Sequence, residues 1–510
     1  MRRRRNKGPG GLAGFRRDLA GTFRELDKRT SAAHKRMVLL VIGVGALLRG
    51  MLMLLPVTHP EAYSFVHFGL SPWSEALSDR TLPGNHILHT LLVKVCASVL
   101  DVSEPVVRLP DLLAGILVLP LFYVFVRAMF NRYVALIALA LVASSPPLVL
   151  YSALSEGIAL GWLFLVLALL AGRHLVKENN PVSAVAMGLF LALGMWVDPD
   201  FLYPALMVLV WSVLYLVLSY SSTLGQRMAT WSLVPVTAVL GTLLGYLPVI
   251  VAHGFGQVFD PGLGTEVADW STFSATHQDG AVEVWLLLST GSGPWLSLLG
   301  FAGVLAAMYI SGKYRALLAG LVLGAVPAVV LRMEVPAAPI FLYSLLVLHL
   351  GSALALFTLL KFVQERFWPK LAKRTRTQLT ALALLVGFGL FTVRGYTGES
   401  VARFAEAPAI ADMFALTLKS DEVVLAQEPW LSPLRFYMQR RGPGMRQVSP
   451  DPMPRTPSTC YVVVAPGDGQ DLDMVLRHHE LDPGRVISTE KLRDRPRTEI
   501  FAVRMAQGRP

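Results

Sequence analysis

Cysteine and charge are both scarce in this chain of 510 residues. Only two residues are cysteine, which excludes a disulfide framework and a zinc site built from thiolates. Cys96 lies in an apolar stretch and Cys460 begins a strand-like run, so each is expected to be a small buried hydrophobic residue rather than a nucleophile. Charged residues make up 16% of the chain and hydrophobic residues 54%, a balance that excludes a soluble globular protein.

A cleavable signal peptide is also missing from the N-terminus. Residues 1–36 form a basic arm with twelve Lys/Arg, which is too long for the n-region of a signal peptide. We expect this arm to lie in the cytoplasm near anionic lipid, partly helical from Leu12 to Lys28, before an uncleaved first anchor. The formal net charge of +11 therefore does not require a nucleic-acid partner, and we expect none.

Long apolar runs dominate the chain from residue 37 to residue 394. Such a run needs roughly 20 residues to cross the hydrocarbon layer, and it must be helical because lipid cannot satisfy open backbone groups. We predict transmembrane helices at about 37–57, 106–127, 133–150, 157–173, 181–197, 201–219, 230–252, 293–311, 315–332, 338–360 and 378–394. The apolar piece at 86–100 is short for a span, and we expect an interfacial or re-entrant helix there.

The distribution of Lys/Arg between these spans predicts their orientation. With a cytoplasmic N-terminus, every connection that falls inside carries Lys or Arg: 127–132, 173–180, 220–229, 312–316 and 361–377. The outer connections 151–156, 198–200 and 253–292 carry none, and the outer loop 58–105 has only Arg80 and Lys94. Because basic residues favour the cytoplasmic side, the C-terminal part of the chain is predicted to lie outside.

Strand-like and helix-like segments alternate after the last span. This pattern predicts a small α/β domain at 395–510, beside the basic arm and a transmembrane domain at 37–394. No GxGxxG follows either central strand, so nucleotide binding has no support there. We expect a packing lid or recognition surface rather than a site of chemistry.

The stretch from Thr58 to His89 gathers polar and aromatic side chains directly after the first span. These include Glu61, Tyr63, Glu75, Asp79, Asn85, His86 and His89. Polar groups at the edge of a bilayer indicate a reaction at the membrane surface. The alternative is an interfacial amphipathic segment, with Tyr63 and Trp73 as headgroup anchors.

Two pairs within this stretch allow further roles. Glu75 and Asp79 are expected on one face of a short helix capped by Ser71, either binding a metal or sugar hydroxyls or facing solvent. His86 and His89 are placed to contact a phosphate or to hydrogen-bond within an interfacial helix. No third ligand is predictable, so we expect no metal site, and a divalent cation has no support.

Polar residues beyond this stretch lie at the outer ends of predicted spans. Arg108 would either bind a phosphate or bridge to Glu104 or Asp111. Arg332 is a second phosphate candidate. Glu156 would pair with Arg108 or Arg332.

Two outer connections complete the candidates. Asp198 and Asp200 would cap the next helix, with Asp200 the better placed, or point into a cavity. The long connection 253–292 would be a lid whose Trp270 stacks on sugar, or merely a tether.

Four local strings resemble the GT-C membrane glycosyltransferases, in the branch of protein O-mannosyltransferases and the lipid A aminoarabinose transferase. They are Glu61-Ala62-Tyr63-Ser64, a Pro-x-x-His in LPGNHILHTLLV (82–93), Arg108-Leu109-Pro110 with Gly115, and the Ser-Pro-rich string ending in Tyr151-Ser152. With the α/β tail, the likeness covers about residues 37–505. It implies a polytopic all-α, GT-C-like membrane domain with a small extracytoplasmic α/β domain.

Members of this superfamily move a sugar from a polyprenyl-phosphate donor to an acceptor at the outer membrane face, with inversion at the anomeric carbon. The resemblance implies that Glu61 is the base or acceptor-orienting group. It implies that Arg108, His86 and Arg332 bind the donor phosphate. The substrate-contacting residues would be Tyr63, Glu75, Asp79, Asn85, His89, Glu156, Asp198 and Trp270.

The sequence departs from the family pattern at three polar positions. Pro60 stands where the family has an aspartate, and Glu156 lies where a phosphate-binding arginine is common. The Arg-Tyr found near the tenth span is absent from VPAAPIFLY, although Arg332 is nearby. Either the site is rebuilt for another donor, or the fold is kept and transfer is lost.

The sequence therefore favours a lipid-linked-sugar transferase of a bacterial inner membrane, with a periplasmic site. Its partners would be a polyprenyl-phosphate sugar donor, membrane lipids, and a lipid, polysaccharide or protein acceptor. The alternative is an inactive relative that binds lipid-linked sugar or an envelope partner. A secondary transporter is a third possibility, but no inverted repeat is visible and charges within the spans are few.

Overall fold

The computed structural model describes residues 11–28, 30–258, 269–290, 293–370, 372–395, 403–440, 443–450, 452, 459–481 and 486–505. The chain divides into two compact units. The first comprises Met1–Leu52, Leu77–His89 and Leu109–Gly395. The second comprises Met53–Ala76, Thr90–Arg108 and Tyr396–Pro510, so the C-terminal segment shares a unit with two pieces of the outer loop.

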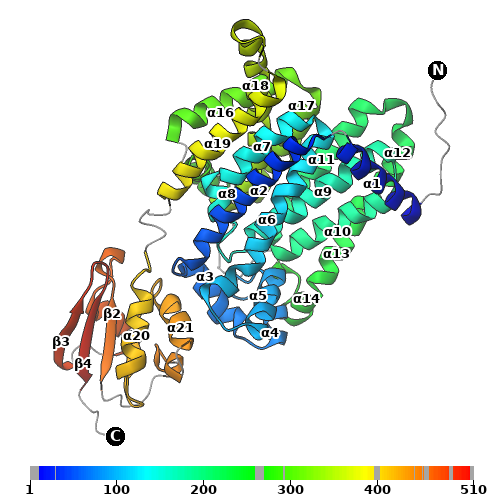
Figure 1. The fold of residues 1–510 in the computed structure, drawn as a ribbon. Helices are drawn as coiled ribbons and strands as arrows, with labels where there is room; N and C mark the ends of the chain where they lie inside the picture. The colour runs from blue at the N-terminus through cyan, green and yellow to red at the C-terminus, as the bar shows by residue number, and fades with distance from the viewer. Residues whose placement is uncertain are drawn as a thin grey trace. The chain divides into compact units, whose positions relative to one another are not determined.

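Helices account for nearly all of the chain up to residue 395 (Figure 1). The earlier ones are α1 (Gly11–Lys28), α2 (Ala32–Met51), α3 (His59–Ser64), α4 (Trp73–Ser78), α5 (Ile87–Val99), α6 (Glu104–Met129), α7 (Arg132–Ser144), α8 (Pro146–Leu150), α9 (Ile158–Glu178), α10 (Pro181–Val197) and α11 (Leu202–Ser219). The later ones are α12 (Leu224–Trp231), α13 (Leu233–Gly245), α14 (Leu247–His253), α15 (Trp270–Leu288), α16 (Gly293–Ile310), α17 (Gly312–Arg332), α18 (Ser344–Phe367) and α19 (Lys373–Gly395). Short 3-10 turns include η3 (Pro199–Phe201) and η6 (Ala338–Tyr343).

Every predicted span coincides with helical structure, which confirms the polytopic all-α architecture. Within the described residues, eight helical segments are long and apolar enough to cross a membrane. The predicted span 133–150 is broken at Ser145, because Pro146 and Pro147 start a new helix, α8. The predicted span 230–252 is likewise divided among α12, α13 and α14. The number of crossings stays a prediction.

Two segments outside the predicted spans are also helical. The basic arm forms α1 over Gly11–Lys28, as predicted for Leu12 to Lys28. The connection 253–292 contains helix α15, so the expectation of one long loop there is wrong for its second half. Residues 259–268 of that connection lie outside the described residues.

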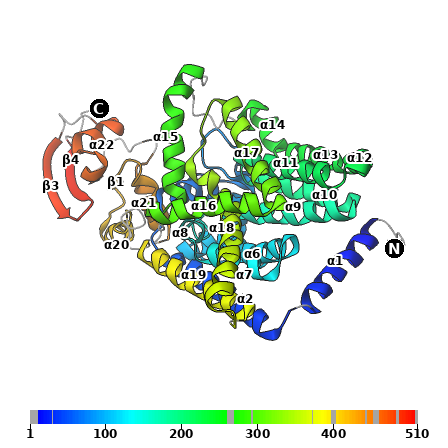
Figure 2. The same cartoon turned by 90° about the horizontal axis from the view of Figure 1, so that it is seen from above.

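Close helix packing holds the first unit together. Helices α9, α10, α11 and α13 lie side by side, and α11 packs against α17 (Figure 2). Gly320 faces Trp211 and Gly324 faces Met207, so the two helices run antiparallel. A Cβ on Gly324 would lie 2.5 Å from the backbone nitrogen of Met207, which shows that only glycine allows this approach.

The second unit contains the α/β structure that the sequence predicts. Helices α20 (Ala407–Thr417), α21 (Leu431–Gln439) and α22 (Leu472–His478) accompany strands β1 (Val423–Leu425), β2 (Cys460–Val464), β3 (Val486–Asp494) and β4 (Glu499–Met505). The sheet order is β1-β2-β4-β3, with β1 and β2 parallel and the other neighbours antiparallel.

A single apolar core joins this sheet region to the outer loop. Ala62 and Phe65, from the segment that follows the first span, lie in one cluster with Trp430 and Phe436. The rings of Phe65 and Phe436 meet edge to face with centroids 5.5 Å apart. The C-terminal segment therefore folds together with the polar outer stretch and is not a separate appendage.

Candidate functional site

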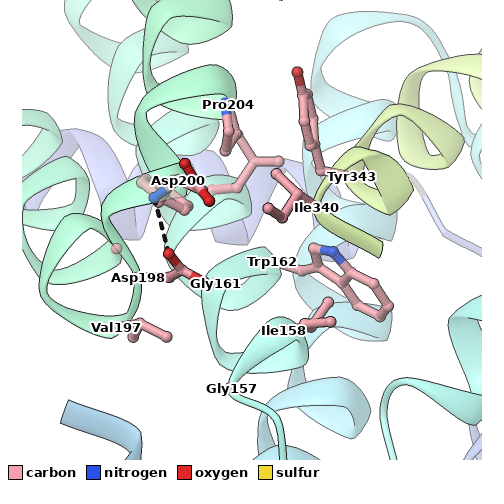
Figure 3. Close-up of a pocket in the computed structure, with 13 residues that line it drawn as sticks. Gly157, Ile158, Gly161, Trp162, Val197, Asp198, Asp200, Pro204, Ile340 and Tyr343 are labelled. Atoms are coloured by element: carbon pink, nitrogen blue, oxygen red, sulfur yellow. Dashed lines mark hydrogen bonds between the residues drawn. The ribbon is translucent and has the colours of Figure 1, made fainter. Parts of the chain in front are cut away.

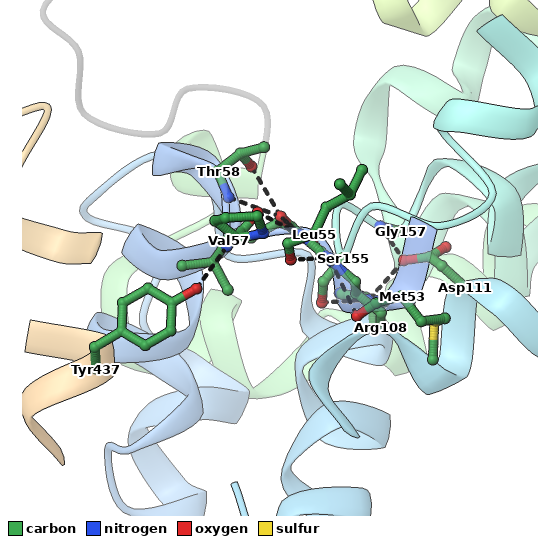
Figure 4. A network of polar contacts seen from close by, with 12 residues as sticks. Met53, Leu55, Val57, Thr58, Arg108, Asp111, Ser155, Gly157 and Tyr437 are labelled. Atoms are coloured by element: carbon green, nitrogen blue, oxygen red, sulfur yellow. Dashed lines mark hydrogen bonds and ion pairs between the residues drawn. The ribbon is translucent and has the colours of Figure 1, made fainter. Parts of the chain in front are cut away.

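Glu61 and Arg108 form a closed ion pair in the second unit. The Arg108 Nε and Nη2 atoms donate to the two Glu61 carboxylate oxygens, each over 2.6 Å. Arg108 also donates to the carbonyl oxygens of Leu55 and Pro56, at 2.6 and 3.0 Å (Figure 4). The backbone N–H of Thr58 donates to Glu61 over 2.9 Å in a capping box at the start of α3. Both side chains are 1% exposed.

This geometry follows from the local sequence. Pro56 and Pro60 keep the chain ahead of α3 out of a helix, so the carbonyls of residues 55 and 56 need donors from elsewhere. The guanidinium supplies these donors while its fork matches the carboxylate. In this structure Glu61 and Arg108 are therefore occupied by each other and sealed from solvent. Their predicted roles as base and phosphate ligand stay predictions.

The bridges from Arg108 to Glu104 or Asp111 stay predictions. Glu104 pairs with Arg440 at 2.7 Å. In the first unit, Asp111 is fully buried, contacts His89 Nε2 at 2.8 Å and accepts the backbone N–H of Gly157 at 2.9 Å. Asp111 thus caps the start of α9, where Gly157 takes a positive φ of 77°. His89 is engaged in this buried network.

A second polar cluster in the first unit is partly open. His86 Nδ1 lies 3.3 Å from Asp198 Oδ2, and Arg332 Nη1 lies 2.5 Å from Asp200 Oδ1. Asp198 Oδ1 accepts the backbone N–H of Asp200 over 2.8 Å, which links the two pairs through η3. These four side chains are between 26% and 30% exposed. We call them the aspartate cluster.

The charges of this cluster set the protonation of His86. Burial alone disfavours the imidazolium, but the hydrogen bond and charge of Asp198 outweigh burial and raise the His86 pKa above its ordinary value of 6.5. The charge of Glu156, in the connection between α8 and α9, acts in the same direction. Burial conversely favours a neutral Asp198, but hydrogen bonds from His86 and from the Asp200 backbone lower its pKa. Both shifts favour the charged forms of the pair, an imidazolium beside a carboxylate.

The aspartate cluster borders a small pocket of about 50 Å³. We call it the aspartate pocket. Its walls come from α9, from the turn between α10 and α11, and from η6, and they include Ile158, Trp162, Ile340 and Tyr343 (Figure 3). Asp198 and Asp200 are the acidic groups of its lining. A mostly apolar wall with a few convergent polar groups is typical of a small-molecule site.

The remaining candidates of the outer stretch are not among the residues that line this pocket. Tyr63 packs its ring 4.1 Å from that of His67, and Glu75 is exposed on α4. Asp79 follows the end of α4 and accepts hydrogen bonds from Thr81, so the expected face shared by Glu75 and Asp79 is wrong. The Asn85 side chain donates to the Asp79 carbonyl over 2.6 Å.

One further expectation about a single residue needs correction, the cap by Ser71, while the role of Trp270 stays a prediction. Ser71 does not cap α4, because its hydroxyl donates to the carbonyl of Phe68 over 2.9 Å. Trp270 starts α15, is 61% exposed, and has its ring 5.6 Å from that of Phe273. No group of three His, Cys, Asp or Glu side chains within the described residues is arranged to hold a metal ion.

Sequence reasoning named Asp198 and Asp200 as caps or as groups that point into a cavity, but it missed apolar lining residues such as Trp162 and Tyr343. It took Asp200 as the better placed to cap, whereas Asp198 caps η3 and Asp200 pairs with Arg332. The D-P-D string indicates Asp198 as the cap, because an aspartate directly before proline is well placed to cap a helix. Trp162 and Tyr343 lie in apolar segments, where periodicity does not separate residues that line a cavity from those that face lipid.

Comparison with known proteins places this geometry in a family context. Residues 85–250 match the family model described as dolichyl-phosphate-mannose-protein mannosyltransferase. No curated protein matches the chain.

Solved structures extend the likeness over nearly the whole chain. ArnT from Cupriavidus metallidurans bound to undecaprenyl phosphate is 14% identical, covers 91% of this chain and 97% of its own, and superposes with a TM-score of 0.60. Apo ArnT gives 13% identity, coverage of 92% and 98%, and the same TM-score of 0.60. The Archaeoglobus fulgidus oligosaccharyltransferase in the apo form is 15% identical over 81% of this chain and 64% of its own, with a TM-score of 0.47.

These findings confirm the predicted resemblance. The chain has the GT-C membrane glycosyltransferase fold of ArnT in a multi-pass membrane protein, with the dolichyl-phosphate-mannose-protein mannosyltransferase pattern over residues 85–250.

Proposed function

We propose that the chain is an inverting glycosyltransferase that moves a sugar from a polyprenyl-phosphate donor to an acceptor of the cell envelope. One observation carries this proposal: the mostly apolar aspartate pocket is lined by the carboxylates of Asp198 and Asp200, and these are paired with His86 and Arg332 beside it. The likeness to ArnT, which was solved with undecaprenyl phosphate bound, supports the class of donor. The predicted topology supports a periplasmic location in a bacterial inner membrane.

The residues of the aspartate cluster suit each part of the reaction. A carboxylate, which we assign to Asp198, takes the proton from the acceptor hydroxyl. The acceptor oxygen then bonds to the anomeric carbon as the bond from that carbon to the phosphate oxygen breaks. The leaving phosphate carries the electron pair and is stabilised by protonated His86 and by Arg332. Attack opposite the leaving group inverts the anomeric carbon.

The carboxylates of the aspartate cluster suit this role better than that of Glu61, because they are more exposed to solvent. Glu61 is 1% exposed, so an acceptor does not reach its carboxylate from solvent. An acceptor hydroxyl needs a carboxylate within hydrogen-bond reach. The side chains of Asp198 and Asp200 are 29% and 26% exposed and lie on a pocket wall.

The closed pair of Glu61 and Arg108 favours a second candidate function. These residues occupy the positions where the family resemblance implies a base and a phosphate ligand, and here they bind each other. A non-catalytic relative that binds lipid-linked sugar would retain the pocket and need no free base.

The release of polyprenyl phosphate tests both candidates without knowledge of the acceptor. The full chain would be reconstituted in liposomes with synthetic polyprenyl-phosphate sugars and an envelope extract, and the freed lipid phosphate measured by mass spectrometry. We expect D198N to lower the rate at least about a hundredfold, the usual contribution of a positioned acid or base. Asp473→Asn, at an exposed position of α22, is the control and should leave the rate unchanged.

The variant E61Q separates the alternatives. If Glu61 is the base, E61Q abolishes release while the protein keeps its folded elution profile, and the assignment of Asp198 is wrong. If the chain is a non-catalytic binder, no donor releases its phosphate in the parent protein, yet polyprenyl phosphate still binds.

A further inference from the structure

A second pocket lies at the other end of the α11–α17 helix pair. Its volume is about 270 Å³, and it is lined by Ala128, Met129, Arg173, Val176, Lys177, Trp211, Tyr215, Tyr220 and Lys313. Because α11 and α17 are antiparallel, Trp211 and Tyr215 of α11 face the start of α17, where Lys313 lies. Asp200 and Arg332 lie at the opposite end of the same two helices. We call this second cavity the basic pocket.

The lining of the basic pocket carries positive charge without a carboxylate. Arg173, Lys177 and Lys313 are its charged members, and no Asp or Glu is among the lining residues that the structure describes. The nearby carboxylate of Glu178 contacts Lys177 Nζ at 3.0 Å. Arg227 stacks 3.7 Å from the Tyr220 ring and donates to the Val176 carbonyl over 2.6 Å, which fixes one wall.

Arg173 and Lys313 already have structural partners at the end of α6. Arg173 Nη2 donates to the Ala128 carbonyl and Lys313 Nζ to the Met129 carbonyl, each over 2.8 Å. These bonds complete the last turn of α6, where cations are favoured. A guanidinium has five N–H donors and an ammonium has three, so each cation keeps donors for a ligand.

One buried donor in the lining is unused. Trp211 is fully buried, and its Nε1 has no hydrogen-bond partner among the residues that the structure describes. An indole N–H is a donor only, and leaving it unpaired in the interior costs free energy. Because this nitrogen is itself sealed, it does not open into the pocket, and the charge that the pocket offers to a ligand comes from the three cations alone.

We propose that the basic pocket binds a phosphate-bearing anion, through Arg173, Lys177 and Lys313. Apart from Trp211 and Tyr215 of α11, its lining falls in four connections that the positive-inside pattern assigns to the cytoplasmic side: 127–132, 173–180, 220–229 and 312–316. The phosphate then comes either from an anionic phospholipid of the inner leaflet or from the cytosol. This site is distinct from the aspartate pocket and does not depend on the proposed transferase function.

Native mass spectrometry of the detergent-solubilised full chain tests this proposal. Phosphatidylglycerol, zwitterionic phosphatidylcholine and inorganic phosphate are titrated separately. We expect the lipid or the free phosphate to bind, and K313A and K177A each to weaken that binding about fivefold to tenfold through loss of a charge-assisted hydrogen bond. R315A, which removes an exposed cation two residues from Lys313 and outside the lining, is the matched control.

The arms of the experiment identify the source of the phosphate. Variant-sensitive binding of phosphatidylglycerol above phosphatidylcholine assigns a lipid headgroup, and variant-sensitive binding of inorganic phosphate alone assigns a soluble anion. K177A guards against misfolding, because Lys177 is half exposed and makes no bond to α6. If no anion binds, or if all three variants weaken binding equally, the proposal is overturned.

Discussion

At the scale of single residues, burial separates two kinds of ion pair. The side chains of Glu61 and Arg108 are at most 1% exposed, so removing either partner would strand a charge in a poorly solvated interior. The pairs of the aspartate cluster are about a quarter exposed, and water screens part of their attraction. Replacing one member of a partly screened pair by a substrate group therefore costs much less free energy. The aspartate cluster is therefore the better candidate for turnover.

Donor binding should weaken at alkaline pH through His86. Its pKa is raised above 6.5 in the folded protein, so the imidazolium–carboxylate interaction is fully present below 6.5 and is lost as pH rises through the raised pKa. We expect affinity for polyprenyl phosphate to fall about threefold to tenfold across that transition, since a charge-assisted hydrogen bond becomes a neutral one. Titration of the reconstituted chain with polyprenyl phosphate between pH 6 and pH 9 measures this effect.

His86→Asn is the control for this pH dependence. The Asn amide donates a hydrogen bond to Asp198 and does not titrate, so its affinity should be nearly independent of pH over the same range. An equally steep pH dependence in the Asn variant would contradict the role of His86.

The sequence predicts some residues of the site but not the contacts between them. His86, Asp198 and Arg332 are recognisable because charge is rare at the outer ends of spans. Their pairing is not recognisable, because it joins residues more than 100 positions apart in the chain. Likewise Glu104 and Asp111 are close to Arg108 in the sequence, whereas Glu61, with which Arg108 forms its ion pair, lies 47 positions away.

At the scale of elements, the antiparallel pair of α11 and α17 holds both pockets. Asp200 precedes α11 and Arg332 ends α17, while Trp211, Tyr215 and Lys313 line the basic pocket farther along the same two helices. The two helices approach closely because glycines face the backbone and side chains of the partner helix. The sequence predicts both helices from hydropathy, but it does not show which neighbour each one packs against.

Gly324→Ala should force this helix pair apart. The new Cβ would meet backbone atoms of residues 206 and 207 within 2.8 Å, and backbone cannot rotate away as a side chain does. We expect a loss of about 1–3 kcal/mol in stability, the usual cost of overpacking. Thermal unfolding of the detergent-solubilised protein measures this loss, and polyprenyl-phosphate affinity should fall with it as Asp200 and Arg332 separate.

Gly387→Ala in α19 is the matched control, because nothing lies within 4 Å of its Cβ position. It should be neutral or slightly stabilising, as alanine favours a helix more than glycine does. Equal melting temperatures for the two variants would show that the close contact of α11 with α17 is not under steric constraint.

At the scale of the whole molecule, each of the two units has its own apolar core. The sequence predicts the helical unit well, because lipid restricts a spanning segment to a regular helix. It also predicts the strands of the second unit. It does not predict that residues 53–76 and 90–108 fold with the C-terminal segment, since that association depends on contacts such as Phe65 with Phe436.

The charge pattern makes a prediction about the orientation of the whole chain. Cys96 and Cys460 are its only cysteines, so replacing both with alanine gives a background for single-cysteine labelling. In sealed vesicles of known sidedness, an impermeant maleimide should reach Ser222→Cys only from the cytoplasmic face, because connection 220–229 carries Arg227 and is predicted inside. It should reach Ser274→Cys and Thr417→Cys only from the opposite face.

All three positions are exposed in the structure, so failure to label would reflect sidedness and not burial. Labelling of Ser222→Cys and Thr417→Cys from one face would require an even number of crossings between them, and the periplasmic assignment of the C-terminal segment would then be wrong.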